Sequence, residues 1–288
     1  MSEARPFASQ TGKSPSEKKR VTLRDVAEEA GVSLKTASNV INHTGRMTDA
    51  TREKVQKVVD RLGYRVNVSA RNLNRGRTGF ITLAVPCLTA PYLAELANRV
   101  IDAARIYGYS VYVTTYAEGT SHGVTSLLRN FNSTISDGMI LSLSEMEDLT
   151  PEDLSVDYPL VCVGARFTHY KADHVTPDDV QSARLATEYL LDRGVSKPAV
   201  VGSRTDFAQL STLRDVTEGN AQLRMRGVFE ACCDRNIALA TELMPNVGHD
   251  WSIGSGARNM QRIIDSGVPF DGVIALNDQL AMGALSTL

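Results

Sequence analysis

The 288-residue sequence lacks any long hydrophobic run, and no apolar stretch approaches the ~20 residues that a membrane-spanning helix requires. Its first 20 residues contain no hydrophobic centre, so they do not have the form of a secretory signal. Only four cysteines occur, none of them in a CxxC spacing, and three fall in apolar patterns. This predicts buried thiols in a reducing compartment, and therefore a cytoplasmic protein that is not attached to a membrane.

Motifs of catalysis and metal binding are also scarce. The sequence has no P-loop pattern GxxxxGK[ST] and no HExxH. Its five histidines share no spacing with one another, or with a cysteine, that would place a nucleophile beside a base. The sequence therefore predicts a protein without enzymatic activity, metal site or cofactor.

What is present begins with residues 21–41, VTLRDVAEEAGVSLKTASNVI, which have the pattern of two short helices around a tight turn. Apolar residues recur at three- and four-residue steps, as on the inner face of a helix. Gly31 stands where the first helix must end, and Ser33 can cap the second. Small Ala27 and Ala37 allow the close crossing that a helix-turn-helix requires. An ordinary helical hairpin is the alternative.

The second of these helices leaves a short polar row on its outer side. The row consists of Lys35, Thr36, Ser38 and Asn39. Side chains of these types, presented by one helix, can contact base edges and phosphates in a major groove. The row therefore predicts contact with double-stranded DNA.

Charge is distributed unevenly along the chain. Residues 1–79 hold 16 Lys and Arg against 8 Asp and Glu, whereas the remaining residues hold 15 against 25. A basic module ahead of an acidic body suits phosphate binding, because each neutralised phosphate releases a counterion. The first 20 residues have no periodicity and are predicted to be a disordered basic tail, which either contacts DNA phosphates or is inert.

From residue 80 onward, strand-like and helix-like runs alternate. The predicted helices between six β-rich runs lie near residues 92–107, 122–131, 180–192, 221–235 and 253–265, with a last helix from 278. Units of roughly 25 to 35 residues are typical of βαβ connections in parallel sheets, and the run is long enough for two lobes. We predict a small all-α helix-turn-helix headpiece followed by an α/β two-lobed body with parallel sheets.

The predicted domain boundaries follow from these patterns. They are 1–20 for the tail, 21–66 for the headpiece, 67–79 for a hinge helix or linker, and 80–288 for the body. Leu73, between two arginines of the linker, could enter a minor groove as an apolar wedge or serve as a docking contact.

The headpiece, in particular VTLRDVAEEAGVSLKTASNVIN followed by TREKVQKVVDRLGY, resembles the lactose/galactose-repressor family of bacterial transcription regulators. The resemblance extends over residues 21–288 and implies that Leu34, Lys35 and Asn39 choose bases. It also places Leu73 at the family's groove-inserting leucine. The full set of predicted DNA contacts is Thr22, Ser33, Leu34, Lys35, Thr36, Ser38, Asn39, Asn42, Ala70 and Leu73.

Asn39 departs from the family pattern, which usually has arginine there. Arginine pairs with guanine through two acceptors, whereas asparagine pairs better with adenine. The resemblance therefore implies an operator that differs from the usual one at that base pair.

By the same resemblance, the body has the periplasmic-binding-protein fold and binds a small polar effector, most simply a sugar. The implied effector contacts are Tyr92, Leu93, Arg224, Trp251, Asn277 and Asp278. A polyol ring suits an aromatic face against its C–H side and charged groups against its hydroxyls. Taken singly, Trp251 could be a core residue, Arg224 a surface ion pair and Asp278 a helix N-cap.

Two further departures concern the body. Gly164 stands where many members have an effector-facing aspartate. The segment formed by residues 203–220 is longer than the corresponding segment of the family usually is. The family's chains also extend beyond the equivalent of Leu288, so the resemblance implies a C-terminally incomplete body.

The resemblance implies a repressor that binds a pseudo-palindromic operator as a homodimer and responds to its effector. Whether the effector releases or strengthens DNA binding stays open. A ligand-blind DNA binder and a solute-binding protein are the alternatives.

Overall fold

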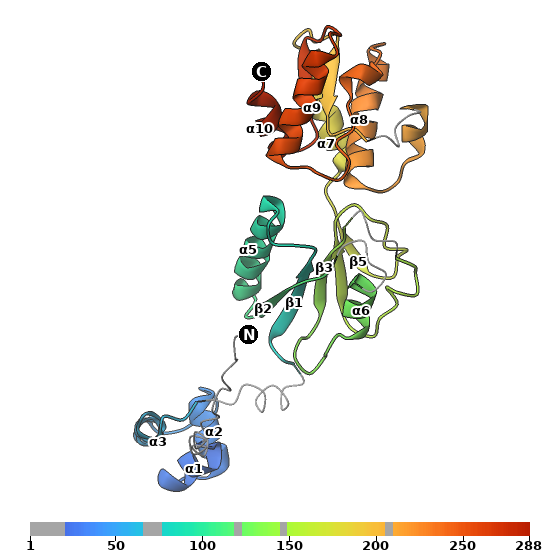
Figure 1. Cartoon of the computed structure of the whole chain (residues 1–288). Helices are drawn as coiled ribbons and strands as arrows, with labels where there is room; N and C mark the ends of the chain where they lie inside the picture. The colour runs from blue at the N-terminus through green and yellow to red at the C-terminus, as the bar shows by residue number, and fades with distance from the viewer. Residues whose placement is uncertain (1–20, 66–76, 118–122, 145–148, 205–209) are drawn as a thin grey trace, which may run out of the picture. The chain divides into compact units, whose positions relative to one another are not determined.

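A computed structural model describes residues 21–65, 77–117, 123–144, 149–204 and 210–288 (Figure 1). The chain divides into two compact units, residues 1–76 and 77–288. Within the described residues, no helix combines the length and the hydropathy that a bilayer span requires. The predicted tail and the predicted hinge contacts Ala70 and Leu73 lie outside the described ranges.

The first unit contains three helices, α1 (Leu23–Glu29), α2 (Leu34–Ile41) and α3 (Asp49–Leu62). Each begins at a hydroxyl side chain that accepts a hydrogen bond from a free backbone N–H. Ser33 accepts from the Thr36 N–H at 3.1 Å, and Thr22 forms a reciprocal capping box with Asp25. These caps determine where each helix starts.

The core of this unit is small and aliphatic. Val26, Ala30, Val40, Val55 and Val58 pack together from all three helices. Ala27 and Ala37 are also buried, as the close helix crossing requires. The helix-turn-helix prediction is confirmed.

The second unit begins with a five-stranded sheet in the order β2-β1-β3-β4-β5, in which every pairing is parallel. Its elements are β1 (Phe80–Val85), α5 (Pro91–Ile106), β2 (Ser110–Thr115), α6 (Gly123–Arg129), β3 (Met139–Ser142), β4 (Leu160–Val163) and β5 (Asp173–Val175).

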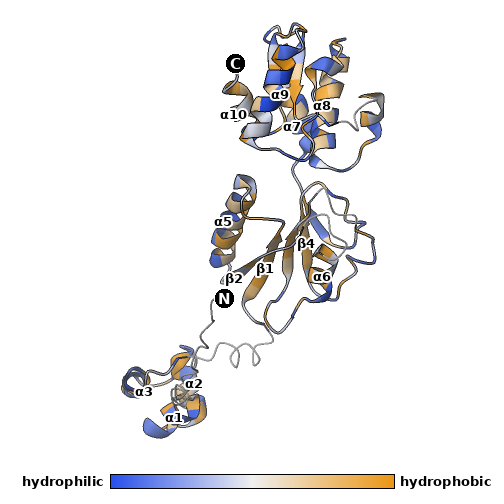
Figure 2. Cartoon of the chain, in the orientation of Figure 1, coloured by the Kyte–Doolittle hydropathy of each residue, from blue (hydrophilic) through white to orange (hydrophobic). Residues whose placement is uncertain are grey.

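Residues of this sheet alternate between two cores, as the two-residue period of a strand dictates. Leu83 and Val85 pack against α5, whereas Ala84 packs with α6 on the other face. We call this sheet with its helices the first lobe. The central strands are correspondingly coloured as hydrophobic in Figure 2.

The second lobe is built around the parallel strands β6 (Pro198–Val201) and β7 (Gly272–Ala275). Its other elements are α7 (Asp179–Leu191), the 3-10 helix η2 (Leu210–Asp215), α8 (Asn220–Asp234), the 3-10 helix η3 (Thr241–Leu243), α9 (Ile253–Asp265) and α10 (Asp278–Leu285). Val200 faces the core formed with α7 and α8, and its neighbours Ala199 and Val201 face the core formed with α9 and α10.

Both helix pairs of this lobe approach closely at glycines. A Cβ added at Gly227 of α8 would lie 2.2 Å from the Val180 carbonyl oxygen of α7. A Cβ at Gly283 of α10 would lie 2.1 Å from the Ile253 oxygen of α9. Side-chain-free positions therefore set how closely these helices pack.

The predicted fold class is confirmed, and the predicted cysteine burial is corrected. Cys162 and Cys232 are buried, and burial raises the pKa of these thiols to about 12 and about 11. Cys87, in the loop between β1 and α5, and Cys233, on α8, are partly exposed.

Candidate nucleic-acid and effector sites

The outer side of α2 carries the predicted base-reading residues. Leu34 is 50% exposed, and Lys35 beside it is exposed as well. The Thr36 hydroxyl is within 2.8 Å of the Ser33 hydroxyl, and the Asn42 amide donates to the Ser38 carbonyl at 2.9 Å. Several of the other predicted DNA contacts therefore also hold the helix ends, whereas the side chains of Leu34 and Lys35 make no hydrogen bond or ion pair with any described residue.

Asn39 lies in a different environment. It is half-buried, and a Cβ added at Gly45 would lie 2.8 Å from its amide nitrogen. Gly45 has φ of 78°, a conformation that favours glycine. Because Gly45 has no side chain, the turn after α2 leaves room for the Asn39 amide beside it. Only part of that amide therefore faces outward.

In the second lobe, Arg224 of α8 is held at two points. Its Nε donates to Asp179 Oδ1 at 2.7 Å, and its Nη1 donates to the Leu276 carbonyl at 2.7 Å. Asn220 donates to the other Asp179 oxygen at 3.1 Å. Asp179 and Asn220 were missing from the predicted site because both read locally as helix-start residues.

Trp251 and Asn277 lie beside this arginine. The Arg224 guanidinium carbon is 5.7 Å from the centroid of the Trp251 ring. Asn277 donates to the Trp251 carbonyl at 3.2 Å and accepts from the Leu280 N–H at 2.7 Å. The structure thus brings Arg224, Trp251 and Asn277 together near the carboxyl end of β7.

Asp278 is the first residue of α10, and Asn277, not Asp278, is the N-cap. The Asp278 carboxylate is exposed and has no hydrogen-bond or ion-pair partner among the described residues. Within the same ranges, Arg224 Nη2 also has no protein acceptor. A polar ligand at Arg224 would meet the free Nη2 donor, and the Asp278 carboxylate is a free acceptor at the start of α10, one residue beyond Asn277.

The two predicted effector residues of the first lobe differ in exposure. Tyr92 is 63% exposed at the start of α5, whereas Leu93 is buried in the core between α5 and the sheet. Tyr92 can face a ligand, and Leu93 packs the helix that carries it.

The lobes touch at the segment that precedes α8. The Gly219 N–H donates to the Ala165 carbonyl at 2.8 Å, and Glu218 accepts from the Phe167 N–H at 3.0 Å. Arg166 pairs with Glu218 at 3.5 Å. These side chains also border a cavity of about 290 Å³.

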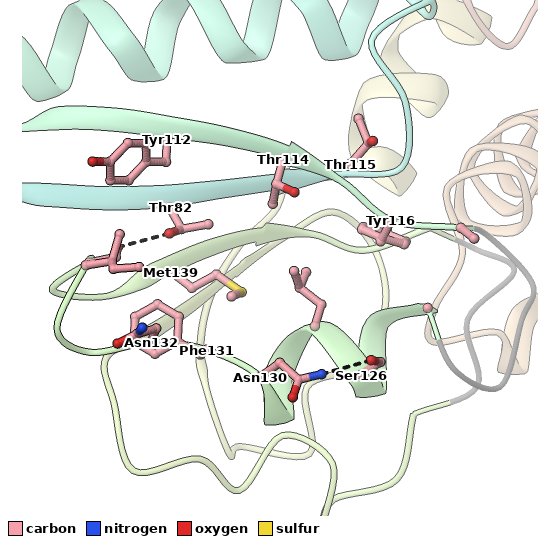
Figure 3. Close-up of a pocket in the computed structure, with 15 residues that line it drawn as sticks. Thr82, Tyr112, Thr114, Thr115, Tyr116, Ser126, Asn130, Phe131, Asn132 and Met139 are labelled. Carbon is pink, nitrogen blue, oxygen red and sulfur yellow. Dashed lines mark hydrogen bonds between the residues drawn. The ribbon is translucent and has the colours of Figure 1, made fainter. Parts of the chain in front are cut away.

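A larger cavity of about 650 Å³ lies in the first lobe between the sheet and α6 (Figure 3). Among the described residues that line it, none is charged, and its polar groups partly satisfy one another, as in the bonds of Thr82 to Ser136 and of Asn130 to Ser126. None of the predicted effector residues lines it. It is therefore separate from the Arg224 cluster.

One catalytic pattern does occur in the sequence. Residues 119–123, GTSHG, match the GxSxG pattern of hydrolase nucleophile elbows. Residues 119–122 lie outside the described ranges. No group of three or more His, Cys, Asp or Glu within those ranges could hold a metal ion.

A helix-turn-helix unit followed by an α/β body with parallel sheets defines a class, the DNA-binding transcription regulators with a periplasmic-binding-protein-like body. Residues 22–67 match the family described as bacterial regulatory proteins, lacI family. Residues 78–288 match the periplasmic binding proteins and sugar binding domain of LacI family. The chain belongs to the lacI family and is a helix-turn-helix transcription regulator.

Known proteins similar to this chain are regulators. It is 27% identical to the HTH-type transcriptional regulator RegA of Clostridium saccharobutylicum, over 93% of this chain and 77% of the relative. It is 28% identical to DegA of Bacillus subtilis, over 92% and 76%.

Solved structures show the same fold. A LacI-type transcription regulator from Bifidobacterium animalis superposes with a TM-score of 0.65 and 30% identity, over 72% of each chain. The lac repressor dimer bound to operator and an anti-inducer superposes with a TM-score of 0.76 and 23% identity, over 93% of this chain and 77% of the other. The latter likeness establishes the fold alone.

Proposed function

We propose that this regulator represses transcription as a homodimer on a pseudo-palindromic operator, under the control of a carbohydrate effector. The observation that carries the effector proposal is the cluster of Arg224, Trp251 and Asn277 at the carboxyl end of β7. Ligands of open α/β sheets bind at such strand ends. DNA binding places the protein in the cytoplasm.

The chemistry of the cluster suits a sugar. The Trp251 ring offers an apolar face for the C–H side of a pyranose, and Arg224 Nη2 can donate to a ring hydroxyl. The free Asp278 carboxylate accepts from a second hydroxyl, and Tyr92 contributes a contact from the first lobe. Gly164 supplies no carboxylate, so the acceptors come from the second lobe.

On the DNA side, Leu34, Lys35 and Asn39 read bases in the major groove. The flanking hydroxyl and amide groups of Thr22, Ser33, Thr36, Ser38 and Asn42 contact phosphates or hold the helix ends. Ala70 and Leu73 enter the minor groove between the half-sites. Two headpieces related by a two-fold axis would bind half-sites about one helical turn apart.

Exposed apolar side chains on α10 support the homodimer. Met282 and Leu285 are 59% and 75% exposed on this helix. An apolar surface of this kind, presented by a helix, marks an association site. A second copy of the chain, related by two-fold symmetry, would cover it.

The proposal is tested by selecting random duplex DNA with the purified 288-residue chain, with and without a panel of sugars. We expect a two-fold symmetric motif whose enrichment at least one sugar changes. Arg224→Met is the matched variant, and it should select the same motif without responding to that sugar. A symmetric motif that no sugar alters would indicate a ligand-blind DNA binder. Sugar binding without any enriched motif would indicate a solute-binding protein.

A further inference from the structure

We propose that Asp179 is the positioning residue of the effector site. It holds the Arg224 guanidinium in place for a ligand, and it shares its second oxygen with the segment that touches the first lobe. This inference rests on the proposed role of Arg224 as an effector contact.

Asp179 is a buried carboxylate, only 2% exposed in its side chain, whereas Arg224 remains 28% exposed. A buried charge is costly unless it is paired and hydrogen-bonded. Both Asp179 oxygens are satisfied, one by Arg224 and the other by Asn220. The pair therefore has its negative partner inside the lobe and its positive partner at the surface, which is the arrangement a ligand could exploit.

The Asp179–Arg224 pair is not the sole contact that holds α7 against α8. Arg184 of α7 already bonds Asp234 of α8, and Arg235 at the end of α8 bonds Asp192 at 2.6 Å. Gly227 brings the two backbones into close contact. Since several other contacts join these helices, the Asp179–Arg224 pair is available for a different role.

That role follows from how Arg224 is held. Asp179 binds Nε and the Leu276 carbonyl binds Nη1, so two separate elements fix the guanidinium plane. Nη2 has no acceptor among the described residues, and the Trp251 ring lies 5.7 Å from the guanidinium carbon. A donor fixed in advance loses less conformational entropy when it binds a ligand.

Asn220 extends the network toward the first lobe. It directly follows Glu218 and Gly219, which bond Phe167 and Ala165 across the lobes. Movement of Arg224 on ligand binding would thus reach the lobe contact through Asp179 and three consecutive residues. The same carboxylate both positions the ligand donor and joins it to the lobe contact.

Trp251 is the single tryptophan of the chain, so its fluorescence in the full-length protein reports this site without any effector. Removing the Asp179 charge leaves the Arg224 charge uncompensated. Iodide is an anion and acrylamide is neutral, so the ratio of iodide quenching to acrylamide quenching of Trp251 reports the charge near the ring. We therefore expect this quenching ratio to rise about twofold in Asp179→Asn. Asp192→Asn, which breaks a different Asp–Arg pair between the same helices, should leave the ratio of iodide to acrylamide quenching unchanged.

Coupling is tested in the Arg224→Met background. There Asp179→Asn should no longer change the quenching ratio, because the two residues act as a pair. With a sugar identified by the operator selection, Asp179→Asn should lower sugar affinity about tenfold and leave sugar-free operator affinity within about twofold.

Any one of three results would overturn the proposal. The quenching ratio could stay unchanged in folded Asp179→Asn, it could change equally in Asp192→Asn, or the effect of Asp179→Asn could persist in full in the Arg224→Met background. If Asp179→Asn does not fold, the double variant decides. Recovery of folding on removal of the unpaired arginine supports the pair, and failure of both variants makes Asp179 purely structural. If the quenching results hold but no sugar binds, the positioning role stands and the carbohydrate proposal fails.

Discussion

Asn39 allows a test of the proposed base contacts at the scale of one side chain. Its amide lies over Gly45 at the end of α2, partly exposed beside Lys35. Asparagine pairs with adenine N6 and N7, whereas arginine pairs with guanine O6 and N7. We expect Asn39→Arg to change the preferred base from adenine to guanine at one position in each half-site, with a discrimination of about 1–3 kcal/mol.

Selection of random duplex DNA by both proteins measures this change. Gln56→Arg is the control, since it adds the same charge on α3 instead of α2. It should strengthen binding generally and keep the wild-type motif. An unaltered motif in Asn39→Arg would show that residue 39 does not read a base.

Asp271 gives a residue-scale prediction for pH. Hydrogen bonds from the Ser196 and Lys197 N–H groups and from the Ser196 hydroxyl hold the pKa of Asp271 below its ordinary value of 3.8. A carboxyl group whose folded-state pKa is lowered stabilises the folded protein at pH values above the ordinary pKa of 3.8. That stabilisation is lost as the pH falls from 3.8 through the lowered folded-state pKa. The stability difference between wild type and Asp271→Asn should therefore be constant from pH 5 to 7 and shrink below about pH 3.8.

Urea unfolding at a series of pH values measures that difference. Asp265→Asn, at an exposed carboxylate on the preceding helix, is the comparison. A stability difference that grew on acidification would contradict the lowered pKa of Asp271.

At the scale of single residues, local signals predicted the cap at Ser33 but not the buried network. Ser33 directly precedes α2, so its role is readable from neighbouring residues. Asp179 meets Arg224 across 45 positions of sequence, and no periodicity marks that meeting. Leu93 was expected at a ligand, yet the three-to-four spacing of α5 places it in the core.

Among the elements, the α7–α8 pair depends on the missing side chain of Gly227. A Cβ at Gly227 would lie 2.2 Å from the Val180 oxygen and 2.9 Å from the Arg184 nitrogen, and backbone atoms cannot yield. We expect Gly227→Ala to destabilise the protein by about 1–3 kcal/mol, as overpacking does. Denaturant unfolding of the full chain measures this cost.

Gly254→Ala is the matched control. Gly254 is also helical, but the nearest atom to an added Cβ is the end of the flexible Arg258 side chain at 3.3 Å. Alanine there should stabilise the protein by about 0.5–1 kcal/mol, because glycine loses more backbone entropy in a helix. Equal effects of the two substitutions would refute the close-packing argument.

The longer elements were predictable because their hydrophobic periodicity is strong. The helix predicted at 253–265 is observed as Ile253–Asp265, and the one predicted at 92–107 as Pro91–Ile106. β5 was not predicted, since Asp173, His174 and Val175 are all exposed and carry no apolar alternation. The 3-10 helix Leu210–Asp215 follows a run with no clear period, and it also escaped prediction.

On the scale of the whole molecule, the uneven charge distribution agrees with the division into units. The basic residues gather in the unit that carries the helix-turn-helix, and the acidic residues in the body that carries the Arg224 cluster. The sequence could predict the boundary between the two units, since the balance of charged residues and the hydrophobic periodicity both change there. How the lobes contact each other could not be read from it, because Glu218 and Arg166 meet only in the folded body.

Binding of an effector at the Arg224 cluster is proposed to change operator affinity. The most direct measurement is an equilibrium titration of the selected operator with the full chain, with and without the responding sugar. We expect two chains per operator, an affinity change of about 5- to 150-fold with the sugar, and no change in Arg224→Met. One chain per operator, or an Arg224→Met protein that responds as the wild type does, would contradict the account.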